Sequence, residues 1–285
     1  MKRLFIFGLG YAGVAIARAA IAKGYDIAGT VTTAAKADEL KRGGIAAELF
    51  GQPGPALAAA THILATIPPT ETGDPAVPLC TAGRPAWIGY LSTTGVYGDA
   101  QGGWVDETTP PAPTQPRSQR RLAAEQAWQA LGIKFGAPVH LFRLPAIYGP
   151  GRSALDQVRA GTARRVDKPG QVFSRIHVAD IAAAVLASME RPAPTGAIYN
   201  VADDEPASQA DVIALAATLL GLPVPPLIAW DEAASALGDM ARSFYAESRR
   251  VRAEHIKHEL GVVLKYPSYR QGLRAIATAR PPTAP

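Results

Sequence analysis

The stretch that decides the fold lies near the start of the chain and reads Arg3-Leu4-Phe5-Ile6-Phe7-Gly8-Leu9-Gly10-Tyr11-Ala12-Gly13. Its first five residues form a short apolar run, typical of a strand buried on both faces, and the run stops at Gly8. An Ala- and Ile-rich segment follows to Ala22, and Gly24 stands where a left-handed C-terminal cap is expected. The stretch predicts a strand, a tight turn and a helix in immediate succession.

The three glycines of the turn have separate places in such a unit. Gly8 permits the tight turn, Gly10 lets a pyrophosphate approach the backbone, and Gly13 allows the helix to pack closely on the strand. The first helical residues, Tyr11 and Ala12, bring unpaired N–H groups and partial positive charge to the same point. We therefore expect a dinucleotide-binding turn. Flavin or S-adenosylmethionine binding, and a fold that holds no cofactor, are the alternatives.

The end of the second strand indicates which dinucleotide is bound. We expect this strand at 27–32, where an Asp or Glu about 20 residues after the glycines would bind the ribose 2′-hydroxyl of NAD. Here Thr32, Thr33 and Lys36 follow, and their hydroxyl and ammonium groups suit a 2′-phosphate. The sequence thus favours NADP as the cofactor, with NAD as the alternative. Lys36 as a solvated helix charge is the other interpretation.

The rest of the chain predicts alternating strands and helices. Strands are expected at 46–50, 62–67, 87–92 and 139–144, and helices at 38–42, from Pro55 and at 118–131. This order predicts the α/β class, with a doubly wound parallel (Rossmann) sheet and ligands at the carboxyl ends of its strands. Later helices are expected at 178–190, 208–220 and 246–260. We predict a dinucleotide-binding domain at 1–149, which also receives 174–201, and a smaller, mostly helical, substrate-binding lobe at 150–285.

Composition and charge exclude several classes of protein. The chain has 285 residues, 48% hydrophobic and 19% charged, as ordinary globular proteins have. Its one cysteine, Cys80, cannot form a disulfide or a cysteine-based metal centre within this chain, and we predict no metal site. The formal charge of +5 is small and dispersed, so it favours a small anionic substrate over nucleic acid.

The N-terminal segment imitates a secretory signal, because Lys2 and Arg3 precede an apolar run. The glycines inside that run suit a nucleotide-binding turn better than a signal helix. Elsewhere the sequence has no stretch near the roughly 18 apolar residues that a membrane span needs. We expect a cytoplasmic protein with neither a membrane nor a nucleic-acid partner.

Four later segments match the motifs of one superfamily in the same order. They are Leu91-Ser92-Thr93-Thr94-Gly95-Val96-Tyr97-Gly98, the segment from Arg143 to Arg152, the segment from Arg175 to Ile181, and the segment from Gly196 to Val201. With the glycine turn they resemble the extended short-chain dehydrogenase/reductase superfamily, in its group of NAD(P)-dependent epimerases and dehydratases. The resemblance implies the doubly wound fold and a nicotinamide cofactor but no particular substrate. It also raises a homodimer as one state of the protein.

Thr93 stands at the family's catalytic Ser or Thr position, three residues before Val96. The resemblance implies that its hydroxyl donates a hydrogen bond to a substrate carbonyl oxygen, where charge develops during hydride transfer. The alternative is that Ser92, Thr93 and Thr94 satisfy backbone groups in a turn.

The family's Tyr-x-x-x-Lys pair is absent from this chain. Arg117 stands at the tyrosine position and Arg121 at the lysine position, one helical turn apart and on one face. Arginine stays protonated, so neither residue can act as a general base. We expect Arg121 to reach the cofactor ribose and Arg117 to bind a carboxylate or phosphate. The acid/base residue is left unassigned, and two solvated arginines are the alternative.

Three further arginines lie in segments that border the family's substrate cleft. They are Arg143, Arg152 and Arg175, and Arg175 resembles the arginine that contacts a nucleotide-sugar pyrophosphate. Converging guanidinium groups predict an anionic substrate, with a nucleotide sugar as one candidate. The alternative for each is a surface or interlobe ion pair. The charged stretch from Arg249 to Glu259 is expected to be an exposed helix.

Two functions fit these observations. The first is an atypical NAD(P)-dependent oxidoreductase or epimerase in which Thr93, Arg117 and Arg121 serve catalysis. The second is a non-catalytic NAD(P)-binding regulator that senses the ratio of oxidised to reduced cofactor. The loss of the tyrosine and the lysine favours the second, while Thr93 and the cleft arginines favour the first.

Overall fold

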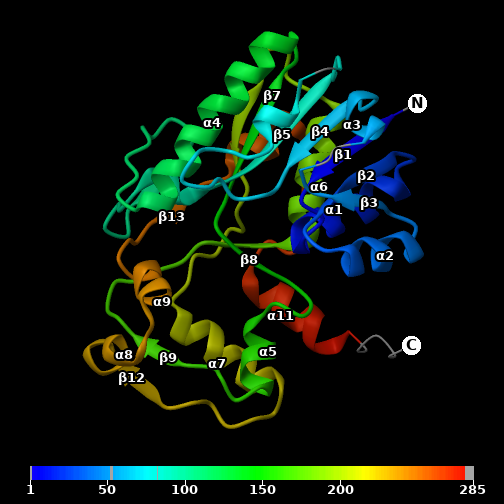
Figure 1. Cartoon of the computed structure of the whole chain (residues 1–285). Coiled ribbons are helices and arrows are strands. Elements are labelled where there is room, and N and C mark those ends of the chain that lie inside the picture. Colours follow the sequence, from blue (N-terminus) through cyan, green and yellow to red (C-terminus); the bar gives the residue numbers. More distant parts are fainter. Residues whose placement is uncertain (1, 52–53, 82, 280–285) are drawn as a thin grey trace.

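The computed structural model describes residues 2–51, 54–81 and 83–279. At its centre lies a seven-stranded sheet in the order β11-β7-β5-β4-β1-β2-β3, in which every neighbouring pair is parallel (Figure 1). The strands are β1 (Arg3–Phe7), β2 (Asp26–Val31), β3 (Ala46–Leu49), β4 (His62–Ala65), β5 (Trp87–Thr93), β7 (Val139–Leu144) and β11 (Ala197–Asn200). The predicted α/β class with a doubly wound parallel sheet is confirmed.

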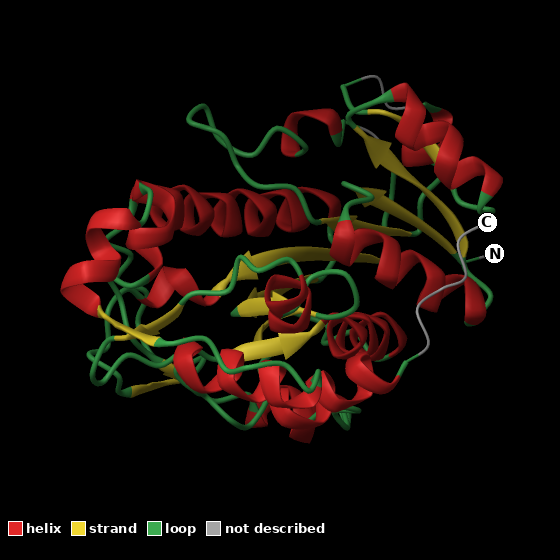
Figure 2. Ribbon diagram, turned by 90° about the horizontal axis from the view of Figure 1, so that it is seen from below, coloured by secondary structure: helices red, strands yellow, loops and turns green. Residues whose placement is uncertain are grey.

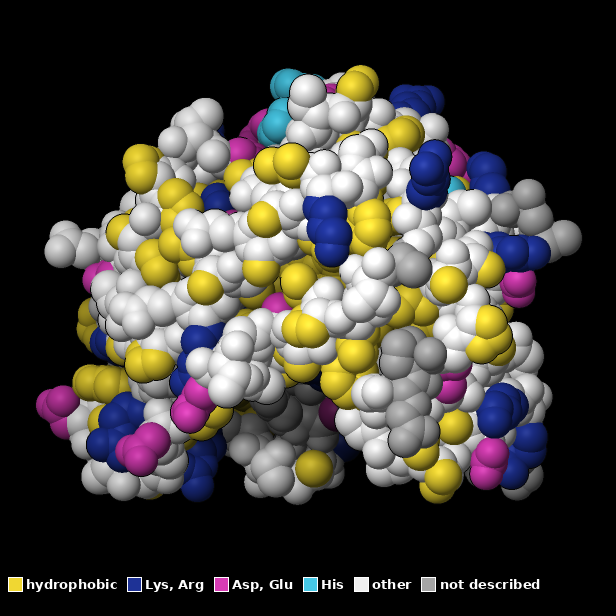
Figure 3. All heavy atoms as spheres, turned by 45° about the horizontal axis from the view of Figure 1, so that its top comes forward, with side chains coloured by type: hydrophobic (Ala, Val, Ile, Leu, Met, Phe, Trp, Pro, Cys, Tyr) yellow, Lys and Arg dark blue, Asp and Glu magenta, His cyan; other side chains and the backbone are white. Residues whose placement is uncertain are grey.

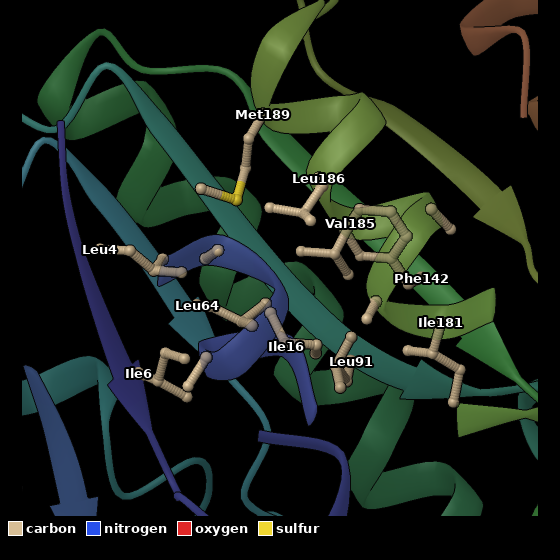
Figure 4. Close-up of a cluster of buried hydrophobic side chains, with 14 of the residues drawn as sticks. Leu4, Ile6, Ile16, Leu64, Leu91, Phe142, Ile181, Val185, Leu186 and Met189 are labelled. Carbon is tan, nitrogen blue, oxygen red and sulfur yellow. The ribbon is translucent and has the colours of Figure 1, made fainter. Parts of the chain in front are cut away.

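Helices cover both faces of the sheet, so the central strands are buried on both sides and most of their residues are apolar (Figure 2). One face packs against α1 (Tyr11–Ala22) and α6 (Val178–Glu190), where Ile16 and Val185 lie in one buried cluster with Leu4 and Leu64 of the strands (Figure 4). The other face packs against α4 through Trp128. The remaining helices around the sheet are α2 (Ala34–Arg42), α3 (Pro55–Ala58), α4 (Pro116–Phe135), α10 (Glu254–Leu260) and the 3-10 helices η1 (Val77–Leu79) and η2 (Thr94–Tyr97).

A smaller, mostly helical lobe lies beyond the carboxyl ends of the strands (Figure 1). Its own core is formed by residues such as Leu155, Ile213 and Leu273. Short parallel pairs connect its loops, β8 with β10 and β9 with β12. The elements are β8 (Ala146–Tyr148), α5 (Ala154–Arg159), β9 (Arg165–Asp167), β10 (Arg175–His177), α7 (Gln209–Leu219), β12 (Leu227–Ala229), α8 (Trp230–Ala236), α9 (Asp239–Phe244) and α11 (Tyr269–Thr278).

The helix predicted at 246–260 is wrong in its first half, because α10 begins only at Glu254. Residues Arg250–Val251 form β13, which pairs in parallel with β6 (Trp104–Val105). Val251 is buried in a cluster with Val96 and Val105. The alternation of polar and apolar residues around it is the sequence signal of a strand. The charged stretch is therefore an exposed helix only beyond residue 253.

Two further features bear on the predicted functions. Among residues 2–51, 54–81 and 83–279, no helix is long and apolar enough to cross a bilayer, and no three His, Cys, Asp or Glu side chains are grouped to hold a metal ion. On the face drawn in Figure 3, Lys and Arg side chains are scattered, and several lie beside acidic ones.

Candidate cofactor and substrate site

The turn after β1 has the geometry that its three glycines predict. A Cβ on Gly8, whose φ is +95°, would lie 2.5 Å from Cγ2 of Ile67, and a Cβ on Gly13 would lie 2.2 Å from the carbonyl oxygen of Gly8. A Cβ on Gly10 would meet nothing within 4 Å. The fold itself thus requires Gly8 and Gly13, whereas Gly10 leaves open space beside the uncapped N-terminus of α1. This space fits the pyrophosphate of a dinucleotide.

Tyr11 and Ala12 open α1, as expected. The Tyr11 hydroxyl donates to the carbonyl oxygen of Pro150 at 3.1 Å, and the Arg152 guanidinium lies 5.5 Å from the centre of the Tyr11 ring. Burial raises the pKa of the Tyr11 hydroxyl. The start of α1 therefore contacts the loop after β8, which leads into the second lobe.

Thr32, Thr33 and Lys36 stand just beyond the end of β2. Thr32 is exposed, whereas the Thr33 hydroxyl caps α2 by accepting the N–H of Lys36. The Lys36 ammonium group lies 2.6 Å from the Glu39 carboxylate, and this hydrogen bond lowers the pKa of Glu39. Sequence reasoning placed Glu39 inside the helix and missed this pairing, although the i,i+3 spacing of the two residues was a signal for it.

A cavity of about 450 Å³ lies at the carboxyl end of β5, and we refer to it as the first cavity. It is bounded by η2, α4, the β8 and β10 segments and α9. The cavity brings together four of the predicted site residues, namely Thr93, Arg117, Arg121 and Arg152. The Thr93 Oγ1 atom also accepts the N–H of Gly95 at 3.1 Å, so the hydroxyl caps the turn while its proton remains available to a ligand.

The two arginines on α4 are held in different ways. Nη1 of Arg121 donates to the carbonyl oxygens of Leu91 and Ile67 and to the Tyr90 hydroxyl at 3.0, 3.3 and 3.1 Å, which fixes the guanidinium between the ends of β4 and β5. Nη1 of Arg117 donates to Ser243 Oγ at 2.8 Å, and its guanidinium lies over the Phe244 ring. Arg121 is thus anchored to the sheet, and Arg117 to α9 of the second lobe.

Arg143 does not line the first cavity, and the prediction that it binds substrate is corrected. Only 2% of this residue is exposed, and its guanidinium forms an ion pair with Glu125 of α4. Its Cζ atom also lies 4.9 Å from the centre of the Tyr97 ring. Because these partners satisfy the guanidinium in the interior, Arg143 links α4 to β7.

Arg175 also lies outside the first cavity. Its neighbours Phe173 and Ser174 line that cavity, while Arg175 lines an adjacent cavity on the other side of the β10 segment. Phe173 and Ser174 precede β10, whereas Arg175 is its first residue. Arg175 therefore lies apart from Arg117 and Arg121, in a cavity that shares Arg152 with the first one.

Sequence reasoning missed Glu247 and Arg249, which line the first cavity. The Arg249 guanidinium donates to the Glu247 carboxylate at 2.8 Å and to the carbonyl oxygen of Gly98, and Glu247 accepts the hydroxyl of Thr114 at 2.6 Å. The only sequence signal for them was the alternation around Val251 that marks β13. With them, the cavity has four arginines and one carboxylate.

Four other titratable side chains, those of Tyr97, Tyr148, His177 and Cys80, are structural. The Tyr97 hydroxyl donates to Asn200 and that of Tyr148 to a backbone carbonyl, and burial raises the pKa of both hydroxyls. His177 accepts the N–H of Ala179 at the start of α6, and burial lowers its pKa to about 4. Burial raises the pKa of the Cys80 thiol to about 12. None of the four lines the first cavity.

Comparisons with known proteins agree with this geometry. The model of the NAD dependent epimerase/dehydratase family matches residues 79–202. A conserved protein of unknown function from Silicibacter pomeroyi is 47% identical, with a TM-score of 0.87 over 97% of this chain and 98% of that one. Protein YeeZ of Escherichia coli K12 is 29% identical over 79% of this chain and 86% of its own.

A dTDP-glucose 4,6-dehydratase from Bacillus anthracis, solved in complex with NAD, shares the fold at 17% identity. Its TM-score is 0.76, over 97% of this chain and 96% of that one. The segment that carries the later motifs, residues 79–202, thus matches the NAD dependent epimerase/dehydratase family, and the whole chain has the fold of this dehydratase.

Proposed function

We propose that the protein is an atypical NAD(P)-dependent oxidoreductase or epimerase whose small anionic substrate binds in the first cavity. One observation carries this proposal: four guanidinium groups and a single carboxylate surround Thr93 at the end of β5. Such a cavity attracts carboxylate or phosphate groups and disfavours cationic ligands. A nucleotide sugar is one candidate, since the dTDP-glucose 4,6-dehydratase from Bacillus anthracis shares the fold.

The cofactor would lie across the carboxyl ends of β1 and β2. The N–H groups at the start of α1 would hold its pyrophosphate above Gly10, and Thr32, Thr33 and Lys36 would face the adenosine ribose. A bound nicotinamide dinucleotide supplies the hydride acceptor or donor. We propose NADP, because hydroxyl and ammonium groups follow β2 directly, with NAD as the alternative that the neighbouring Glu39 favours.

Within the first cavity each residue has a distinct task. The Thr93 hydroxyl donates a hydrogen bond to the reacting oxygen of the substrate. Arg117, Arg152 and Arg249 bind the anionic group. Arg121, fixed through Nη1 between the strand ends, directs its remaining donors to the ribose of the cofactor. The cofactor side of this arrangement is supplied by residues 1–149 together with 174–201. Most of the substrate side is supplied by residues 150–285.

A second function, that of a non-catalytic regulator, is favoured by the residue types that line the first cavity. No tyrosine or histidine lines it among the residues that the structure describes, and Arg117 is already held by Ser243 and Phe244. A chain with this cavity can bind cofactor and an anion without moving a proton. It would then act as a regulator whose affinity differs between oxidised and reduced dinucleotide.

Oxidation of NADPH and NADH in the presence of small anionic carbonyl compounds and sugar nucleotides tests the first function. We expect turnover with at least one compound, a loss of tenfold or more in kcat for Thr93→Ala, and retention of most activity in Thr93→Ser, which keeps the hydroxyl. Equal kcat values for Thr93→Ala and the wild type contradict the role of Thr93. Absence of turnover together with different affinities for NADPH and NADP supports the regulator.

A further inference from the structure

The first cavity has an apolar wall for which the proposed chemistry has no use. The wall consists of Ile147 of β8, Val172 and Phe173 before β10, and Met240 and Phe244 of α9. Met240 is 67% exposed and Phe244 is 54% exposed, although both side chains are large and apolar. Apolar groups left exposed at a cavity are typical of a surface that the apolar part of a ligand covers.

Helix α9 presents these two side chains without burying any of its own residues. Met240 and Phe244 stand one helical turn apart, so they share one face of the helix. Both side chains line the first cavity, and the rest of the described chain leaves more than half of each uncovered. This face of α9 is therefore open to a ligand in the cavity.

Arg117 connects the apolar wall to the part of the cavity that attracts anions. Its Cζ atom lies 4.3 Å from the centre of the Phe244 ring, and its Nη1 atom lies 3.3 Å from the sulfur of Met240. Within the described residues only Nη1 of this guanidinium donates hydrogen bonds, so Nε and Nη2 are left for a carboxylate. A carboxylate bound there has apolar side chains directly beside it.

The polar side chains of the first cavity suit an acid better than a sugar. Sugar hydroxyls donate hydrogen bonds as well as accept them, and carboxylate and amide oxygens are the side-chain groups that accept best. In the described part of the chain no Asp, Asn or Gln side chain lines this cavity. Its one carboxylate, that of Glu247, already accepts hydrogen bonds from Thr114 and Arg249. The other polar side chains are guanidinium and hydroxyl groups, which donate to an oxyanion.

We propose that the ligand of the first cavity is a small carboxylic acid with an apolar chain or ring, and not a nucleotide sugar. The arginines hold its carboxylate, and Met240 and Phe244 cover its apolar group. The inference rests on the proposed function, because it takes the first cavity as the substrate site, and it names the class of that substrate.

Calorimetric titration of the protein with three carboxylates tests the proposal. The probes are acetate, hexanoate and glucuronate, which has the charge and the number of carbons of hexanoate but carries hydroxyl groups instead of an apolar chain. Because acetate and hexanoate share the carboxylate, the ratio of their dissociation constants measures what the apolar wall contributes.

The variants are Phe244→Ser, which removes most of the apolar side chain, and Phe244→Leu, which keeps an apolar one. The matched control is Ile133→Ser, at a residue of α4 that is 85% exposed and does not line the first cavity. All three variants are expected to fold, because both residues are mainly exposed.

We expect hexanoate to bind roughly tenfold or more tightly than acetate and glucuronate, since each methylene group that is fully buried contributes about fourfold. Phe244→Ser should reduce the acetate-to-hexanoate ratio below about threefold, whereas Phe244→Leu and Ile133→Ser should keep most of it. Three results overturn the proposal: glucuronate that binds as tightly as hexanoate, a ratio that Phe244→Ser leaves unchanged, or no binding of any of the acids up to roughly 50 mM.

Assays of NADPH oxidation on the same proteins separate this proposal from the proposed function. Selective binding of hexanoate without turnover of any compound supports the ligand class and contradicts the proposed reaction. Turnover of a sugar nucleotide without that selectivity supports the reaction and overturns the ligand class.

Discussion

Arg143 and Glu125 form an ion pair in the interior, with Nη2 2.8 Å from Oε2 and Nε 3.1 Å from Oε1. The Ser92 hydroxyl donates to the same carboxylate at 2.5 Å. The three residues belong to β7, α4 and β5, so the network joins the helix that bears Arg117 and Arg121 to the strand that ends in Thr93. It therefore positions both sides of the first cavity.

Removal of the carboxylate from this ion pair is expected to destabilise the fold. Glu125→Ala leaves the Arg143 charge buried and unpaired, which costs about 3–5 kcal/mol of unfolding free energy. The double variant with Glu125→Leu and Arg143→Met removes both charges and should recover most of that loss. Urea unfolding measures the unfolding free energy of both variants. A decrease of less than about 1 kcal/mol for Glu125→Ala contradicts this account.

Gly10 separates the demands of the cofactor from those of the fold. A Cβ on Gly10 meets no protein atom within 4 Å, so Gly10→Ala should cost only about 1 kcal/mol or less of stability, the usual penalty at a helix N-cap. A dinucleotide pyrophosphate would occupy that space, and its dissociation constant should rise tenfold or more.

The matched control for this change is Gly238→Ala, at the N-cap of α9, where a Cβ is equally unhindered. It should lose similar stability and keep the wild-type affinity for dinucleotide. Calorimetric titration compares the two variants, and equal affinities in both would remove Gly10 from the cofactor site.

The stability of the protein should fall between pH 6.5 and 8 because of Asp203. Burial raises the pKa of this carboxyl to about 8, above the value near 3.9 of an unfolded chain. Between those values the folded state holds one more proton than the unfolded state, so stability decreases as the pH rises and levels off above about 8. Asp203→Asn should abolish a decrease of roughly 1 to 2 kcal/mol over this range. Denaturant unfolding of the wild type and of Asp203→Asn at pH 6.5 and at pH 8 measures this decrease. An equal decrease in both proteins would contradict the raised pKa.

Cys80 should resist thiol reagents in the folded protein. Its side chain is buried, its Sγ atom donates to the carbonyl oxygen of Ala76, and burial raises its pKa to about 12, so little thiolate exists at neutral pH. Ellman's reagent should react with the protein only after denaturant unfolds it. Rapid reaction of the native protein would show that the segment around η1 opens readily.

The fold could be predicted because its signals are local. The apolar run before Gly8, the glycine spacing and the alternation of strands with helices are all set by neighbours in the sequence. The start of the helix predicted at 246–260 was wrong because β13 gains its stability from β6, almost 150 residues away. Charge periodicity alone cannot show such a pairing.

The site could be predicted in part, for the same reason. Thr93, Arg117 and Arg121 follow strand ends or share a helix face, so sequence position brought them to the first cavity. Whether an arginine faces a ligand or a buried acid depends on tertiary contacts, and this is why Arg143, which pairs with Glu125, was placed wrongly. Arg175 lines the cavity next to the first one. Arg249 reaches the cavity through the β6–β13 pairing and through its own β-bridge with Phe173.

The central claim is that the turn from Gly8 to Gly13 binds a nicotinamide dinucleotide. Thermal unfolding of the protein with NAD, NADH, NADP and NADPH tests it most directly, because a ligand that binds only the folded state stabilises it by roughly 2.7 kcal/mol at 100 times its dissociation constant. We expect saturable stabilisation, larger with the 2′-phosphorylated pair and weakened in Gly10→Ala. Unchanged melting temperatures with all four dinucleotides would contradict the account.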